Sequence, residues 1–262
     1  LRVFRVLRAA PFPLIAAPRP YTLSARTPRP TKETSSQMIV TIDGPAGSGK
    51  SSLAKRVAKA LRWMYLDTGA TYRAVAYQAQ RQGLDIHQPE ELDRLCRTLD
   101  LDFQWADNGD LRVIVDGADV SDAIRTEQIS SFASRVATLP QVRNAMVDKQ
   151  RQLAAQFDNV VTEGRDQGTV VFPHAQLKIF LDASVEERAK RRQLQLEQSG
   201  QPADYDQILQ AIRQRDNQDS TRATAPLVAA EDAVKLDTTN LTLDQVETKV
   251  LELIQAKRSS RP

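Results

Sequence analysis

The sequence is poor in cysteine, in histidine and in long apolar runs, and each shortage excludes a class of protein. Its single cysteine, Cys96, cannot form a disulfide within the chain, which fits a reducing, intracellular setting. No apolar run approaches the roughly 20 residues of a membrane-spanning helix, so we expect a cytoplasmic protein with no membrane partner. The two histidines, His87 and His174, lie outside the phosphate-binding segments described below, and we expect both to be bystanders.

Acidic residues are scarce at the N-terminus, and this distorts the net charge. Residues 1–37 hold six Arg, one Lys, one Glu and six prolines, a local charge of +6. Because the whole chain carries +3, residues 38–262 carry −3, which argues against nucleic acid as a partner of the folded part. The N-terminal segment cannot bury enough apolar surface to offset its ordering entropy. We expect a disordered, basic, proline-rich extension or translation from an upstream start, with a transit peptide or a polybasic arm as alternatives.

The most informative segment is a phosphate-binding loop that follows an apolar run. Residues 39–42 predict a buried strand, residues 44–51 match G-x-x-x-x-G-K-S, and a helical pattern follows from Lys50. Such a loop points several backbone N–H groups and a helix N-terminus at one anion. Lys50 can reach the β and γ phosphates, and the Ser51 hydroxyl can ligate Mg²⁺. We therefore expect ATP to contact Gly44, Pro45, Ala46, Gly47, Ser48, Gly49, Lys50, Ser51 and Ser52.

The rest of residues 38–262 alternates strands with helices, which predicts an α/β domain with a parallel sheet. We expect further strands at 63–66, 160–162, 177–181 and 233–236, and helices at 50–61, 70–82, 89–99, 185–198, 205–218 and 243–256. Residues 101–105 and 111–115 instead alternate around a turn signal at 107–110, which predicts a small antiparallel meander. With the helical stretch that follows, it marks an inserted subdomain over about residues 101–157.

Two further strand ends carry residues suited to an anion. The Thr68 hydroxyl and Arg73, one helical turn on, can face one phosphate, the alternative being a turn with a surface arginine. After the strand at 160–162, Arg165 can bind phosphate and Asp166 can accept from a base or sugar donor, the alternative being an ordinary β-turn. Ligands in open α/β sheets collect at the carboxyl ends of strands, so we expect both pairs near the phosphate loop.

Two helices downstream carry clustered arginines. Arg188, Arg191 and Arg192 share one helical face, where like charges repel unless an anion lies between them. Phosphoryl transfer needs cations where charge develops; a solvated basic face is the alternative.

The second cluster is Arg215, Asp219 and Arg222, spaced i, i+4 and i+7. One helix face would present two guanidiniums around a carboxylate, which suits ribose hydroxyls and a base edge. A surface salt-bridge ladder is the alternative.

Taken together, residues 38–262 resemble the bacterial-type cytidylate kinases of the nucleoside monophosphate kinase superfamily. The resemblance rests on residues 42–45, 67–73, 134–137 with 142–143, 163–173, 180–184 and 222–227. The run G-R-D-x-G-T-V-V-F-P at 164–173 is far more specific than the phosphate loop. Thr68 stands where serine is usual and Glu163 where aspartate is common, and neither change puts much in doubt.

The resemblance implies a P-loop kinase core, an inserted monophosphate-binding subdomain and a helical lid over about residues 185–222. It implies ATP with Mg²⁺ as donor and CMP or dCMP as acceptor, in pyrimidine nucleotide metabolism. The implied acceptor contacts are Ser134, Arg143, Asp166 and Arg222 to cytosine, Thr68, Arg73 and Arg165 to phosphate, and Arg215 and Asp219 to ribose. Arg188, Arg191 and Arg192 are implied to close over ATP.

We expect a monomer that works by positioning and charge neutralisation, without a covalent intermediate. The residues expected to act in catalysis are Lys50, Arg165, Arg188, Arg191 and Arg192. A kinase for another small acceptor, such as UMP or shikimate, is the alternative within enzymes. A P-loop regulator that binds ATP and reports to a partner is the alternative from another class.

Overall fold

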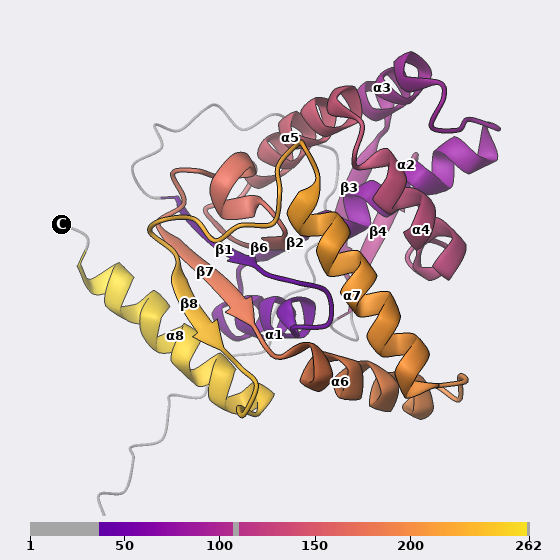
Figure 1. Cartoon of the computed structure of the whole chain (residues 1–262). Coiled ribbons are helices and arrows are strands. Elements are labelled where there is room, and N and C mark those ends of the chain that lie inside the picture. The colour runs from indigo at the N-terminus through magenta and orange to yellow at the C-terminus, as the bar shows by residue number, and fades with distance from the viewer. Residues whose placement is uncertain (1–36, 107–109, 261–262) are drawn as a thin grey trace, which may run out of the picture.

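The computed structural model describes residues 37–106 and 110–260 (Figure 1). Apart from Gln37 and Asp110, the N-terminal extension predicted at 1–37 and the turn predicted at 107–110 lie outside the described residues. Across the described part of the chain, no helix is long and apolar enough to cross a membrane.

A five-stranded parallel sheet forms the centre of the molecule, as predicted, in the order β2-β6-β1-β7-β8. Its strands are β1 (Met38–Asp43), β2 (Met64–Asp67), β6 (Asn159–Gly164), β7 (Leu177–Asp182) and β8 (Val234–Asp237). The central strands are buried on both faces, so they carry nearly continuous apolar runs. Because β1 lies between β6 and β7, the segments that leave these three strands meet at one edge of the sheet.

Within the described residues, eight α-helices connect and cover the strands (Figure 1). They are α1 (Lys50–Leu61), α2 (Thr68–Arg81), α3 (Pro89–Thr98), α4 (Glu127–Val136), α5 (Pro140–Ala154), α6 (Val185–Gln198), α7 (Tyr205–Thr221) and α8 (Leu243–Ser259). Local capping explains several of their starts: Asp67, Ser184 and Asp204 each accept a hydrogen bond from the first turn of α2, α6 and α7. The α1 helix packs on β6 and against α8.

The predicted antiparallel meander is present as β3 (Leu101–Trp105), β4 (Leu111–Val115) and β5 (Ala118–Asp119). It packs against α2, and a 3₁₀ turn (Ala123–Arg125) leads from it into α4. Two features differ from the sequence-based expectation. A π-helical turn (Gln167–Val171) follows β6, and α7 continues to Thr221, so that Arg222 lies in extended backbone just beyond it.

Candidate active site

The phosphate loop joins β1 to α1 through backbone conformations that favour glycine. Gly47 and Gly49 have φ values of 76° and 89°, and a Cβ on Gly44 would come within 2.0 Å of the Leu181 carbonyl oxygen. Lys50 folds back over the loop, where its Nζ donates to the Pro45 carbonyl at 2.6 Å. Burial, followed by the charge of Arg165, holds the pKa of Lys50 well below its usual range. A triphosphate bound here would supply the negative charge that this buried cation lacks.

Ser51 lies at the start of α1 beside a buried carboxylate. Its hydroxyl donates to Glu163 Oε1 at 2.8 Å, and the Tyr65 hydroxyl lies 3.5 Å from the same oxygen. Burial, followed by the charge of Asp67, raises the pKa of Glu163. Mg²⁺ in kinases takes one or two protein oxygens together with substrate phosphates, and Ser51 with Glu163 fits that pattern. The described residues contain no group of three His, Cys, Asp or Glu side chains that could hold a metal alone.

Asp43 belongs to the same strand end, although it is not among the site residues expected from the sequence. It ends β1, and its two carboxylate oxygens accept from the backbone N–H groups of Gln167 at 2.9 Å and Gly168 at 2.7 Å. These bonds tie the π-helical turn after Asp166 to the strand that carries the phosphate loop. The only sequence signal was a carboxylate ending a buried strand directly before the loop. Burial raises the pKa of Asp43 to about 6, against the opposing effect of the two N–H donors.

The raised pKa of Asp43 predicts a component of stability that is lost as pH rises. Between pH 3.8 and about pH 6, Asp43 keeps its proton in the folded chain but releases it in the unfolded chain. The resulting stabilisation is complete below pH 3.8 and is lost above about pH 6. The difference between the two pKa values corresponds to about 3 kcal/mol in the free energy of unfolding. In urea unfolding between pH 4 and pH 7, the wild type should therefore lose stability relative to Asp43→Asn. A difference between the two proteins that does not change with pH contradicts this.

A buried ion pair links α5 to the segment after β6. Arg143 pairs with Asp166, donates to the Ala137 carbonyl at 3.2 Å and lies over the Tyr72 ring, 5.9 Å from its centroid. Burial raises the pKa of Asp166, while Arg143 and then Arg222 oppose that rise. Arg143, Asp166 and Arg222 come from three segments far apart in the chain and together form one polar group. The family resemblance implies that this group binds the acceptor.

Asp219 on α7 connects this group to Arg165. Its Oδ2 accepts from Arg165 Nε at 2.6 Å, and its Oδ1 lies 4.0 Å from Arg222 Nη1. Arg222 Nε donates to the Ala225 carbonyl, whereas its buried Nη2 has no hydrogen-bond partner among the described residues. The predicted cluster is therefore assembled, although Arg222 reaches it from beyond the end of the helix. A guanidinium nitrogen without an acceptor is suited to a ligand oxygen.

The remaining acceptor-side residues divide into those near this cluster and one apart from it. Arg73 pairs with Asp67 at 3.1 Å, and its buried Nε lacks a partner within the described chain. Thr68 gives its hydroxyl proton to the Glu163 carbonyl at 2.6 Å. Desolvation, and then the charge of Arg165, lowers the pKa of Arg215 although its side chain keeps exposed surface. Ser134 is exposed on α4 and donates to the Ser130 carbonyl, and within the described residues no hydrogen bond joins it to the other candidates.

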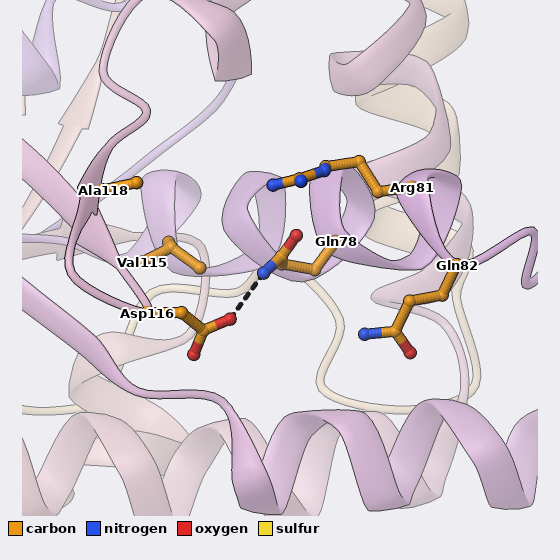
Figure 2. Close-up of a pocket in the computed structure, with 6 residues that line it drawn as sticks. All are labelled: Gln78, Arg81, Gln82, Val115, Asp116 and Ala118. Carbon is orange, nitrogen blue, oxygen red and sulfur yellow. Dashed lines mark hydrogen bonds between the residues drawn. The ribbon is translucent and has the colours of Figure 1, made fainter.

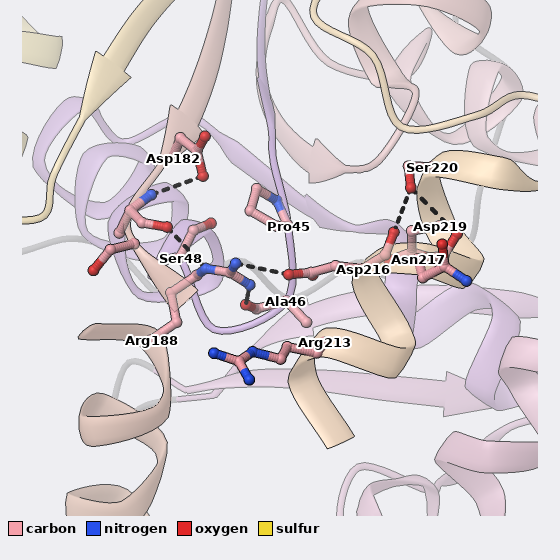
Figure 3. A network of polar contacts seen from close by, with 12 residues as sticks. Pro45, Ala46, Ser48, Asp182, Arg188, Arg213, Asp216, Asn217, Asp219 and Ser220 are labelled. Atoms are coloured by element: carbon pink, nitrogen blue, oxygen red, sulfur yellow. Dashed lines mark hydrogen bonds and ion pairs between the residues drawn. The ribbon is translucent and has the colours of Figure 1, made fainter. Parts of the chain in front are cut away.

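The three arginines of α6 do not converge on one point. Arg188 is buried against the phosphate loop, where it donates to the Ala46 carbonyl at 2.9 Å (Figure 3). Arg191 turns to the Thr238 carbonyl at 2.6 Å, and the exposed Arg192 bonds Gln195 on its own helix. Each of the three arginines donates to a different oxygen acceptor, which offsets the charge repulsion expected when all three share one helix face. Of the remaining loop residues, Ser48 is buried and Ser52 is exposed.

A separate hollow of about 400 Å³ lies between α2 and the β4–β5 turn (Figure 2). Its lining residues are Gln78, Arg81, Gln82, Val115, Asp116 and Ala118, and Gln78 Nε2 donates to Asp116 at 2.5 Å. None of the expected site residues lines it. The candidate active site is instead the strand-end cluster from Lys50 through Arg165 and Asp219 to Arg222.

Comparison with known proteins shows the family of the chain. The family model for cytidylate kinase matches residues 40–256. The cytidylate kinase of Enterobacter sp. (strain 638) is 46% identical over 224 residues, covering 86% of this chain and 98% of that protein. That of Escherichia coli (strain K12 / DH10B) is 46% identical over 219 residues, covering 84% and 96%.

Solved structures add only a distant likeness. The shikimate kinase of Bacteroides thetaiotaomicron covers 83% of this chain and 98% of its own, with a TM-score of 0.41 and 12% identity, too weak to carry an argument. The family model and the relatives each span most of the chain, and the phosphate loop and arginine cluster are assembled within that span. By its match to the family model and to these relatives, the chain belongs to the cytidylate kinase family.

Proposed function

We propose that the protein transfers the γ-phosphoryl group of ATP to CMP or dCMP, giving ADP and CDP or dCDP. The observation that carries the proposal is the position of Arg165. It follows Gly164, which pairs with Asp43 directly before the phosphate loop, and its Nε bonds Asp219 Oδ2 at 2.6 Å. This position supports a role for Arg165 in contacting the transferred group between donor and acceptor. The family membership of the chain supports the choice of a cytosine nucleotide.

The chain's residues supply orientation and positive charge for an in-line transfer. The acceptor phosphate oxygen is already a nucleophile near neutral pH, so no strong general base is needed. Lys50 and Arg165 neutralise charge that develops on the transferred group, and the phosphate loop holds the donor. Ser51 and Glu163 would hold Mg²⁺, which would supply positive charge to offset the negative charge of the phosphates.

On the acceptor side, we assign the base to the Arg143, Asp166 and Arg222 group. An aspartate carboxylate accepts from the cytosine amino group and repels the carbonyl oxygen that uracil has in its place. The unpartnered Nη2 of Arg222 and Nε of Arg73 supply donors for ligand oxygens. We also assign Ser134 to the base, on the family resemblance alone. We propose that residues 101–157 bind the monophosphate and that the protein acts as a monomer.

An ADP-release assay with MgATP and each acceptor in turn tests the proposal. We expect CMP and dCMP to be used with kcat/KM at least about 10-fold above UMP, because a site built to bond an amino group rejects an analogue without it. Shikimate, AMP and GMP are the further comparisons, and the assay is run with and without residues 1–37. Equal use of UMP and CMP contradicts the cytosine assignment. Saturable CMP binding without ADP formation favours a regulator.

A further inference from the structure

Arg188 is held entirely by protein oxygens. Its side chain is 6% exposed, and each of its three nitrogens has an acceptor. Nε donates to the Ala183 carbonyl at 3.0 Å, Nη1 donates to the Ala46 carbonyl at 2.9 Å, and Nη2 pairs with Asp216 Oδ2 at 2.7 Å (Figure 3). Three of its five N–H donors therefore point at protein oxygens, and its burial leaves little of it accessible to a phosphate, which was the role expected for it.

The phosphate loop packs closely on the same residue. A Cβ built on Gly47 would lie 3.3 Å from Arg188 Cβ and 3.5 Å from its carbonyl oxygen. The loop backbone is therefore held at Ala46 by a hydrogen bond from Arg188, and at Gly47 it passes so near Arg188 that a side chain there would touch it. Arg188 lies in the first turn of α6, so it ties the start of this helix to the phosphate loop.

Asp216 connects this arrangement to the acceptor side. It lies on α7 directly after Arg215 and three residues before Asp219, which bonds Arg165. One carboxylate thus joins the helix that carries the acceptor cluster to the arginine that holds the phosphate loop. A second ion pair between α6 and α7, Arg213 with Glu186 at 3.2 Å, is exposed at 59% and 51%, and among the described residues neither partner has a hydrogen bond to the loop or the cluster.

We infer that Asp216 is a positioning residue that acts through Arg188, holding the phosphate loop and the acceptor-bearing α7 helix in one arrangement. Arg188 is then also a positioning residue rather than a contact to ATP. The inference deepens the proposed function and rests on it for the meaning of the acceptor side. Its effect on the phosphate loop does not depend on which acceptor is used.

The test is a double-mutant cycle on the full chain, with the dissociation constant for ATP measured by calorimetry in the absence of acceptor. We expect Asp216→Ala to weaken ATP binding about 10-fold, the scale of one charge-assisted hydrogen bond. Arg188→Ala should have a similar effect, and the double variant should be no worse than either single one. Asp216→Asn keeps an acceptor oxygen for Arg188 and should recover most of the loss, whereas Arg213→Ala serves as the matched control and should leave binding unchanged.

Three outcomes overturn the inference. Effects of Asp216→Ala and Arg188→Ala that multiply in the double variant show that the two residues act independently. A loss at Arg188→Ala far larger than at Asp216→Ala shows that Arg188 contacts ATP directly. An effect of Arg213→Ala equal to that of Asp216→Ala shows only general loosening of the two helices.

A second measurement separates this inference from the proposed function. CMP-dependent ADP release by the wild type tests the function, whereas acceptor-free ATP binding tests the positioning role. If the function holds, Asp216→Ala should also reduce the factor by which CMP tightens ATP binding, and Arg213→Ala should preserve that factor. Circular dichroism at the assay temperature checks that each variant is folded. If Asp216→Ala does not fold, the same measurements are made with Asp216→Asn.

Discussion

Replacing Lys50 with alanine will lower kcat by at least about 100-fold, the scale of one lost transition-state contact. Its ammonium group lies within the phosphate loop, where it donates to the Pro45 carbonyl at 2.6 Å and to Ser48 Oγ at 3.4 Å. Because it is a buried cation with a lowered pKa, its removal should leave the midpoint of thermal unfolding unchanged or raised when ATP is absent. Steady-state kinetics with saturating CMP and a melting curve without nucleotide measure the two effects.

Lys55 on the same helix is the matched control for Lys50. It makes an exposed ion pair with Asp110 at 2.7 Å, and such pairs contribute little to stability. Lys55→Ala should keep kcat within about 2-fold, which corresponds to less than about 0.5 kcal/mol. A folded Lys50→Ala protein that turns over within a few fold of the wild type would remove the phosphate loop from the mechanism. Arg165→Ala is expected to lose at least about 100-fold as well.

Breaking the Arg143–Asp166 pair should have the largest effect on stability. Both side chains are buried, at 4% and 7% exposure, and a buried charge left without its partner costs about 3–5 kcal/mol. Arg143→Ala should therefore lower the free energy of unfolding by about 3 kcal/mol, because Arg222 still partly compensates Asp166. Urea unfolding at pH 7 measures the loss.

An apolar replacement of both partners separates stability from acceptor binding. Arg143→Met with Asp166→Leu removes both buried charges and should recover most of the lost stability, because isosteric apolar pairs often replace buried ion pairs without cost. The same double variant should still fail to use CMP, since no carboxylate remains for the amino group. The exposed pair Arg97–Asp93 provides the control, and Arg97→Ala should cost less than about 1 kcal/mol. Normal CMP turnover by the double variant would place the base elsewhere.

Patterns that act within a few residues were predictable from the sequence. The apolar run into β1, the glycines of the loop and the start of α1 are neighbours in the chain, so their geometry follows from local propensity and the needs of φ. The same holds for the β3–β4 meander, whose alternation marks a half-buried antiparallel pair. The π-helical turn at 167–171 carries no such local pattern, and it depends on the Asp43 carboxylate more than 120 residues away.

The sequence predicts the partners of a side chain only where those partners lie nearby in the chain. Helical spacing places Arg188, Arg191 and Arg192 on one face, yet it cannot show that the Ala46 and Thr238 carbonyls lie within reach of two of them. Helical spacing also predicts that Arg222 lies on the same helix as Asp219. In the structure, α7 ends at Thr221, and Arg222 reaches Asp219 from the extended backbone just beyond the helix.

Local patterns along the chain are enough to predict most of the helices and strands and the anion-binding loop between β1 and α1, because those features depend on neighbouring residues. The position of β6 between β1 and β2 is instead a property of the packed molecule. That order places Arg165 and Asp166 beside both the phosphate loop and Thr68, and it buries Asp43 and Asp166 where their charges need partners. The physical reason is that strand order and ion-pair choice are settled by the packing of distant segments, which no local pattern in the chain records.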